Sequence, residues 1–106
     1  YAARTKPSEG VTQRLWAKAL VLEDGKRGRV VIVTTDLIGL PRSVSDTIAA
    51  RVAKQHGLER SRLMLNSSHT HSGPVVRPNL MTMYFLNRAQ TDAVEGYAQK
   101  LVDDVV

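Results

Sequence analysis

Two histidines separated by one residue are the part of this sequence best suited to chemistry. They are His69 and His71, in the stretch Asn66-Ser-Ser-His-Thr-His-Ser-Gly-Pro74. If the backbone is extended there, side chains two residues apart lie on the same face of the chain. Two imidazoles so placed can hold one metal ion together, or one can bind the metal while the other acts as an acid or base beside it. Gly73 and Pro74 then bend the chain and turn backbone N–H groups toward a ligand.

The place of this motif in the predicted sheet supports a functional site. A strand over residues 63–67 ends just before His69, and a strand over residues 29–35 ends just before Asp36. We expect these strands to be parallel, and ligands bind beyond the carboxyl ends of parallel strands in open sheets. Asp36 and His69 should therefore lie on the same edge, where the Asp36 carboxylate could orient a metal-bound imidazole from the second shell. A turn or capping role is the alternative for Asp36.

The histidine pair also has a purely structural interpretation, because a bare His-x-His sequence is common. Two other side chains have simple interpretations. His56 falls in the last turn of a predicted helix, where the helix dipole favours a cation, and is expected at the surface. Trp16 falls on the first predicted strand and is expected to pack, with partial exposure because Arg14 and Lys18 share its face.

The elements that must position these residues alternate between strand and helix. Apolar and β-branched runs predict strands over 14–23, 29–35 and 63–67. The turn signal Asp24-Gly-Lys-Arg-Gly28 joins the first two as an antiparallel hairpin. A helix over 42–56 links the second strand to the third, which makes those two parallel with a right-handed crossover. The predicted fold class is α/β: a mixed sheet with an antiparallel hairpin followed by a βαβ unit, with helices packed on the sheet, as part of a larger domain.

Finer features of these elements can also be predicted. Ser43 and Asp46 resemble a capping box at the start of the first helix, and Gly57 is placed as its left-handed C-terminal cap. The unbroken β-branched run in 29–35 indicates a strand buried on both faces.

The loops and the buried faces of the helices can be predicted as well. Residues 1–10 and most of 70–88 are predicted to be loop, including Pro78-Asn79, with a short helix at 81–86. The apolar stripe of the first helix is Val44, Ile48 and Val52, with Ala49 and Ala53 beside it. A last helix should begin near Ala89 and bury Val94, Tyr97, Ala98, Leu101, Val102 and Val105.

Composition limits the class of protein. The chain has 106 residues, which is typical of one domain, and no cysteine, so disulfides and thiolate zinc sites are excluded. Residues 1–88 contain 14 Lys and Arg against 6 Asp and Glu, a balance of +8, while residues 89–106 contain 1 against 4, a balance of −3. The basic residues are scattered and have no aromatic residues among them, which indicates a solvated surface and no nucleic-acid partner. No stretch reads as a transmembrane helix or secretory signal.

Three stretches, in matching order and spacing, resemble the N-terminal part of the neutral/alkaline, non-lysosomal ceramidase family. The first is Gly10-Val-Thr-Gln-Arg-Leu-Trp-Ala-Lys-Ala-Leu-Val-Leu-Glu-Asp24, and the second is Val30-Val-Ile-Val-Thr-Thr-Asp-Leu37. The third is the histidine motif, Leu63-Met-Leu-Asn-Ser-Ser-His-Thr-His-Ser-Gly-Pro74. The likeness runs over residues 1–106, so we expect a partial N-terminal ceramidase-like domain, truncated at both ends.

The resemblance implies a zinc-dependent amidase that cleaves the N-acyl bond of a ceramide into a fatty acid and a sphingoid base. It makes His69 a zinc ligand and places His71 in the active site close to the substrate. It also implies that the remaining ligands, a His, a Glu and a Tyr, come from later sequence. By itself, the chain should therefore be inactive and need the rest of its domain or self-association. The expected partner is a small-molecule or lipid amide, with contact to a membrane surface left open. The resemblance implies a secreted or periplasmic location, which the sequence alone leaves unknown.

One departure from the family pattern bears on the substrate. The family commonly continues Ser-Gly-Pro with two glycines, where this chain has Val75 and Val76. β-Branched residues forbid most of the backbone conformations that glycine permits, so the loop beside the metal must run differently. Hydrolysis of another amide or of an ester therefore stays open. Two non-enzymatic alternatives are a scaffold that has lost activity and a module that binds anionic ligands, with structural histidines.

Overall fold

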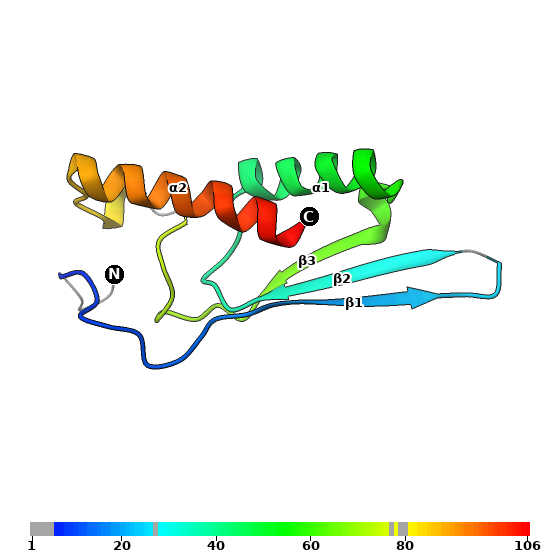
Figure 1. The fold of residues 1–106 in the computed structure, drawn as a ribbon, viewed down its shortest axis with the longest axis horizontal. Helices are drawn as coiled ribbons and strands as arrows, with labels where there is room; N and C mark the ends of the chain where they lie inside the picture. Colours follow the sequence, from blue (N-terminus) through cyan, green and yellow to red (C-terminus); the bar gives the residue numbers. More distant parts are fainter. Residues whose placement is uncertain (1–5, 27, 77, 79–80) are drawn as a thin grey trace.

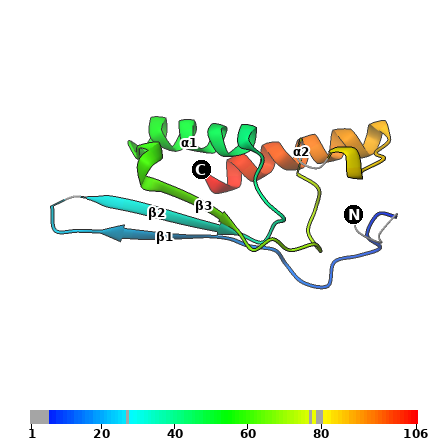
Figure 2. The ribbon, with the colours of Figure 1, turned by 180° about the vertical axis from the view of Figure 1, so that it is seen from behind.

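The computed structural model describes residues 6–26, 28–76, 78 and 81–106. Within these ranges the chain forms two layers, a three-stranded sheet and two α-helices that lie on the same side of it (Figures 1 and 2). The sheet is mixed, with an antiparallel hairpin followed by a parallel pair, so the predicted fold class is confirmed. Residues 1–5 of the predicted N-terminal loop, as well as Arg27 in the hairpin turn and Asn79, lie outside the described residues.

The strands are arranged in the order β1-β2-β3. β1 (Ala17–Glu23) pairs antiparallel with β2 (Arg29–Thr35), and β3 (Leu63–Ser67) pairs parallel on the other side of β2. In that register Ser67 lies opposite Thr35, so the two parallel strands end side by side. This common end positions the candidate site.

The hairpin turn is held by the side chain of Asp24. Its carboxylate accepts hydrogen bonds from the backbone N–H groups of Lys26 at 2.8 Å and Gly28 at 2.7 Å. The bond from Gly28, followed by that from Lys26, holds the pKa of Asp24 below its ordinary value of 3.8. A Cβ atom at Gly28 would come within 2.6 Å of this carboxylate, so only glycine lets the carboxylate approach the backbone there.

The first helix, α1 (Arg42–His56), has the predicted bounds but not the predicted N-terminal cap. Its N-cap residue is Pro41, without a side-chain hydrogen bond, and the Asp46 carboxylate contacts Arg42 instead of a backbone amide. The capping-box prediction for Ser43 and Asp46 was therefore wrong. The C-terminal prediction is confirmed, because Gly57 adopts φ 65° and donates its N–H to the Ala53 carbonyl.

The second helix, α2 (Arg88–Val105), starts with a capping box that the sequence analysis missed. The Asn87 side chain accepts from the Gln90 N–H at 2.9 Å, and the Gln90 side chain accepts from the Asn87 N–H at 3.0 Å. The signal was present as Asn-x-x-Gln, since amide side chains fill both roles of this motif. Before it, the expected short helix over 81–86 is one turn of 3-10 helix, Met81–Met83.

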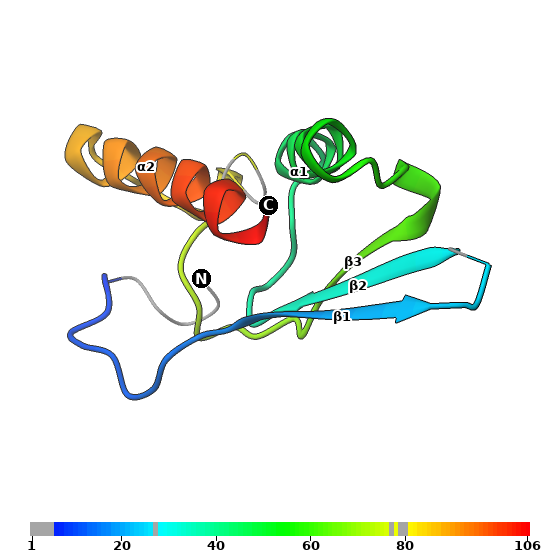
Figure 3. The ribbon, with the colours of Figure 1, turned by 45° about the vertical axis from the view of Figure 1, so that its right-hand side comes forward.

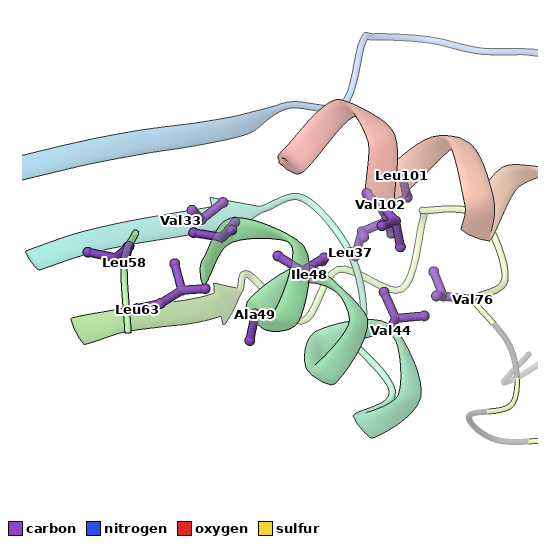
Figure 4. Packing of buried hydrophobic residues seen from close by; sticks show 11 residues of the cluster. Val33, Leu37, Val44, Ile48, Ala49, Leu58, Leu63, Val76, Leu101 and Val102 are labelled. Carbon is purple, nitrogen blue, oxygen red and sulfur yellow. The ribbon is translucent and has the colours of Figure 1, made fainter. Parts of the chain in front are cut away.

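The hydrophobic core lies between the helices and one face of the sheet (Figure 4). The other face of the sheet is exposed, and Val30 at 43% and Met64 at 57% exposure illustrate this. The prediction that the second strand is buried on both faces was therefore wrong, because both helices pack on the same side. The core residues are Val33, Leu37, Val44, Ile48, Ala49, Val52, Leu58, Leu63, Val76, Leu101 and Val102.

An ion pair also connects the two helices. Arg51 on α1 makes an ion pair with Asp103 on α2. The C-terminal end of α2 lies beside α1 (Figure 3). The hydrogen bond from Arg51 holds the pKa of Asp103 below 3.8. His56 is exposed, as expected, with Nε2 2.9 Å from the Val106 carbonyl oxygen. No helix in the described ranges is long and apolar enough to cross a membrane.

Candidate functional site

Hydroxyl groups join the ends of β2 and β3, from which the candidate site extends. Thr35 is 2% exposed, and its Oγ1 donates to the Asn66 carbonyl at 3.2 Å. Since that bond uses the single hydroxyl proton of Thr35, the Ser67 hydroxyl donates to Thr35 Oγ1 across 2.9 Å. The backbone N–H of Ser68 then donates to the Thr35 carbonyl at 3.0 Å. These bonds hold the backbone in place directly before the histidine motif.

His69 is held by a bond from its ring to the loop after β2. Its Nδ1 lies 2.8 Å from the carbonyl oxygen of Ile38. A carbonyl oxygen only accepts hydrogen bonds, so Nδ1 carries the proton and Nε2 presents a lone pair. Histidines that bind metals usually donate their other ring N–H to a carbonyl or carboxylate in this way. With Nδ1 engaged in this way, Nε2 is the ring nitrogen of His69 that is left to bind a ligand.

The two imidazoles meet, although the backbone is not extended as the prediction assumed. His69 adopts φ 60°, a left-handed conformation that is unusual outside glycine and costs about 1–2 kcal/mol. The chain therefore turns at His69, directly after the strand. The His69 and His71 rings nevertheless lie edge to face, with centroids 5.2 Å apart and planes at 67°. Both side chains are exposed at the end of the sheet.

Asp36 lies at the same edge of the sheet, as predicted, and its carboxylate holds the start of β1. Its Oδ2 accepts from the backbone N–H of Trp16 at 3.0 Å, while its own N–H donates to the Trp16 carbonyl at 3.0 Å. These bonds explain why β1 begins at Ala17 and not at residue 14. In a regular antiparallel pair the Trp16 N–H would donate to the backbone carbonyl of Asp36, but here it donates to the Asp36 carboxylate, so the ladder stops at this residue. Trp16 itself is 53% exposed. The contact that orients His69 comes from Ile38, and the second-shell role of Asp36 stays a prediction.

The loop after His71 is fixed by a close approach and by an apolar anchor. A Cβ atom at Gly73 would lie 3.4 Å from the Asp36 carbonyl oxygen, so the loop packs tightly on the segment that follows β2. Val76 is 2% exposed and belongs to the same buried cluster as Leu37 and Val44 (Figure 4). The departure from the family's glycines thus has a structural consequence here, because Val76 ties the loop to the core.

A groove of about 690 Å³ opens beside His71. The loop 73–75 forms part of it, the 83–86 segment and α2 form another part, and residues 6–8 close one side. Tyr97 on α2 is not part of the groove lining but is half-buried against the hydrophobic core, and burial, followed by the charge of Asp104, raises its pKa above 10.0. The groove was not foreseen, because it forms between segments that are distant in sequence.

The donors at this end of the sheet suit zinc in kind but do not complete a site. Imidazole nitrogen is a common zinc ligand, and zinc sites usually have three or four protein ligands. Among the residues that the structure describes, no group of three His, Asp or Glu side chains could hold a metal ion together. His69 therefore qualifies as one ligand of a larger set.

Comparison with known proteins gives this site its context. The chain is 31% identical to the neutral ceramidase of Pseudomonas aeruginosa over 109 residues, a match that covers 95% of this chain. The chain spans only 16% of the length of that relative. No solved structure gives a significant match. All residues, 1–106, match the family described as neutral/alkaline non-lysosomal ceramidase, N-terminal, and the chain belongs to this family.

Proposed function

We propose that this chain forms part of the active site of a zinc-dependent hydrolase that cleaves the N-acyl amide bond of a ceramide-like lipid. The products are a fatty acid and a sphingoid base. Family membership supports the reaction class. The observation that carries the zinc proposal is the 2.8 Å contact between His69 Nδ1 and the Ile38 carbonyl oxygen, because it leaves Nε2 as the nitrogen that can bind a metal.

In this proposal His69 would hold zinc through Nε2, and His71 would face the substrate. A zinc ion held there would supply a Lewis acid for the amide carbonyl and a nucleophilic water near neutral pH. His71 is the general acid or base, since an imidazole exchanges protons in that pH range. The edge-to-face packing of the two rings keeps His71 beside the metal ligand. Asp36 acts from the second shell, through the loop that carries Ile38.

The proposal assigns the remaining zinc ligands to residues outside this chain. This agrees with the share of the relative that the chain covers, 16% of its length. By itself, the 106-residue chain should then lack measurable amidase activity and bind zinc weakly, because one or two imidazoles leave most of the coordination to water. Turnover of an N-acyl substrate by the monomeric chain with added zinc would contradict this assignment.

The test is a chimera in which this chain replaces the matching stretch of the Pseudomonas aeruginosa neutral ceramidase. The chimera should contain zinc and hydrolyse N-acylsphingosine. His69→Ala should lose both zinc and activity, whereas His71→Ala should keep most of the zinc and lose at least 100-fold in kcat, on the order expected for a general acid or base. His56→Ala is the matched control and should change neither quantity. Equal zinc content in His69→Ala and the unmodified chimera would refute the role of His69.

Two outcomes would favour the alternatives. A scaffold without activity would show no zinc in the chimera and no change of zinc content on substitution of either histidine. A module that binds anionic ligands would bind anionic lipid vesicles with an affinity that falls steeply with salt, independently of His69.

A further inference from the structure

The hydroxyl group of Thr35 lies inside an otherwise apolar core. Thr35 is 2% exposed and is the single buried polar residue in the part of the chain that the structure describes. A hydroxyl that is taken out of water costs free energy unless it is hydrogen-bonded, and valine would occupy nearly the same space without that cost. Packing therefore does not explain this hydroxyl, and its bonding partners must.

The partners of Thr35 are the last residues before His69. Its Oγ1 bonds the Asn66 carbonyl at 3.2 Å and the Ser67 hydroxyl at 2.9 Å, and its backbone carbonyl accepts the Ser68 N–H at 3.0 Å. The ordinary backbone contact of a parallel pair accounts only for the bond from Ser68. The hydroxyl adds two bonds, so one residue of β2 fixes three consecutive residues at the end of β3.

His69 needs such support because its own backbone is strained. A non-glycine residue at φ 60° persists only where the surrounding structure holds it there. On the other side of His69, its ring Nδ1 lies 2.8 Å from the carbonyl oxygen of Ile38, three residues after Thr35. The segment 35–38 thus holds both the backbone before His69 and its ring. If the end of β3 were free, the backbone at His69 would relax and its ring would leave the Ile38 carbonyl.

We propose that Thr35 is a positioning residue for His69. Its buried hydroxyl fixes the end of β3 so that Nδ1 of His69 meets the Ile38 carbonyl and Nε2 is presented to a ligand. Thr35 itself contacts neither ligand nor substrate and acts through the backbone of β3. This inference rests on the proposed function for the identity of the ligand, zinc, but the orientation of the His69 ring can be measured without any metal.

The proton on the His69 ring tests this role in the zinc-free chain of 106 residues. At about pH 8 a neutral imidazole carries one proton, and nitrogen NMR of labelled histidine shows which ring nitrogen holds it. In the unmodified chain Nδ1 should hold the proton, because it donates to Ile38. Thr35→Val should shift the proton partly to Nε2, and Thr35→Ser should restore the unmodified spectrum. Thr34→Val, an exposed neighbour on β2, is the matched control and should change nothing.

Zinc affinity of the chimera described above tests the consequence for the ligand. In a competition titration with a chromophoric chelator, Thr35→Val should bind zinc roughly tenfold more weakly, as when a residue that orients a metal ligand is lost. Thr35→Ser should bind zinc as the unmodified chimera does. Val52→Ala separates positioning from a general loss of stability, because it removes core contacts of α1 and leaves the end of β3 intact. It should leave both the His69 ring and zinc affinity unchanged.

Three results would overturn the proposal: an unchanged His69 ring in folded Thr35→Val, no rescue by Thr35→Ser, or an equal effect of Val52→Ala. If Thr35→Val unfolds, Ser67→Ala replaces it, since it removes one of the two hydroxyl bonds from a half-buried position. Its His69 ring should change in the same direction but less, and an unchanged ring would refute the role of Thr35. A chimera without zinc would refute the zinc proposal and leave the ring measurement valid, whereas an unchanged ring would leave the test of His69 as a zinc ligand unaffected.

Discussion

Replacement of Thr35 by valine should destabilise the end of the sheet that carries the candidate site. Valine has nearly the shape of threonine, so the change removes the hydroxyl without opening a cavity. Thr35 Oγ1 bonds both the Asn66 carbonyl, at 3.2 Å, and the Ser67 hydroxyl, at 2.9 Å. Both bonds are lost in Thr35→Val, and the Ser67 hydroxyl must find another partner beside a residue that is 2% exposed.

The magnitude follows from the two bonds. Each contributes about 0.5–1.5 kcal/mol net, so their loss lowers the free energy of unfolding by about 2 kcal/mol. With a urea m-value of about 1–2 kcal/mol/M for a chain of this size, the unfolding midpoint should fall by roughly 1–2 M. Thr35→Ser keeps the hydroxyl but loses a buried methyl group, and should lower the free energy of unfolding by about 1 kcal/mol.

Urea unfolding followed by circular dichroism measures these differences. Thr34→Val is the matched control, since Thr34 is the neighbouring residue of the same strand and is exposed on the outer face. It should change the free energy of unfolding by no more than about 0.5 kcal/mol. Equal stability of Thr35→Val and Thr34→Val would refute the reasoning, because burial of the hydroxyl pair would then contribute nothing.

Three further substitutions test the helix ends and the contact between the helices. Gly57→Ala should destabilise the protein by about 1 kcal/mol in urea unfolding, because alanine resists φ 65°, although no atom lies within 4 Å of the added Cβ. Unchanged stability of Gly57→Ala would contradict the role of the left-handed cap. Asn87→Ala should cost about 1 kcal/mol and speed amide hydrogen exchange in the first turn of α2, and unchanged exchange at Gln90 would contradict the capping box. The hydrogen bond from Arg51 lowers the pKa of Asp103 below 3.8, so the contribution of this ion pair to stability is present above pH 3.8 and is lost as the pH falls through the lower pKa of the folded state. The urea midpoint of the unmodified protein should exceed that of Asp103→Asn at about pH 5, and the difference should shrink as the pH is lowered below 3.8. A difference that stays constant over this range would contradict the role of the ion pair.

Local pattern predicted the elements because each is encoded within its own stretch. The β-branched run at 29–35, the Asp-Gly turn and the glycine after α1 required no knowledge of the rest of the fold, and all three are confirmed. Burial of β2 could not be predicted in this way. Its outer face is as apolar as its inner face, and only the placement of both helices on one side distinguishes them.

The candidate site was predictable in its position but not in its geometry. Topology alone brings Asp36 and His69 to one edge, because both follow strands that are parallel neighbours. The partner of His69 is a backbone carbonyl, at Ile38, and every residue has such a group, so no side chain in the sequence marks it. The positive φ of His69 was equally hidden, since nothing in the residue type requires it.

The parallel pairing of β2 with β3 has a consequence for the order in which the chain folds. β1 and β2 can pair as soon as a short turn closes, on a timescale of about 1–10 μs. β3 can join only after the much longer stretch that contains α1 has crossed the sheet, which costs more loop-closure entropy. We therefore expect the turn at His69, which follows β3, to form only after β3 has joined β2. A ligand held at His69 should then leave the refolding rate nearly unchanged and slow unfolding, so that its effect is seen as a longer lifetime of the native state.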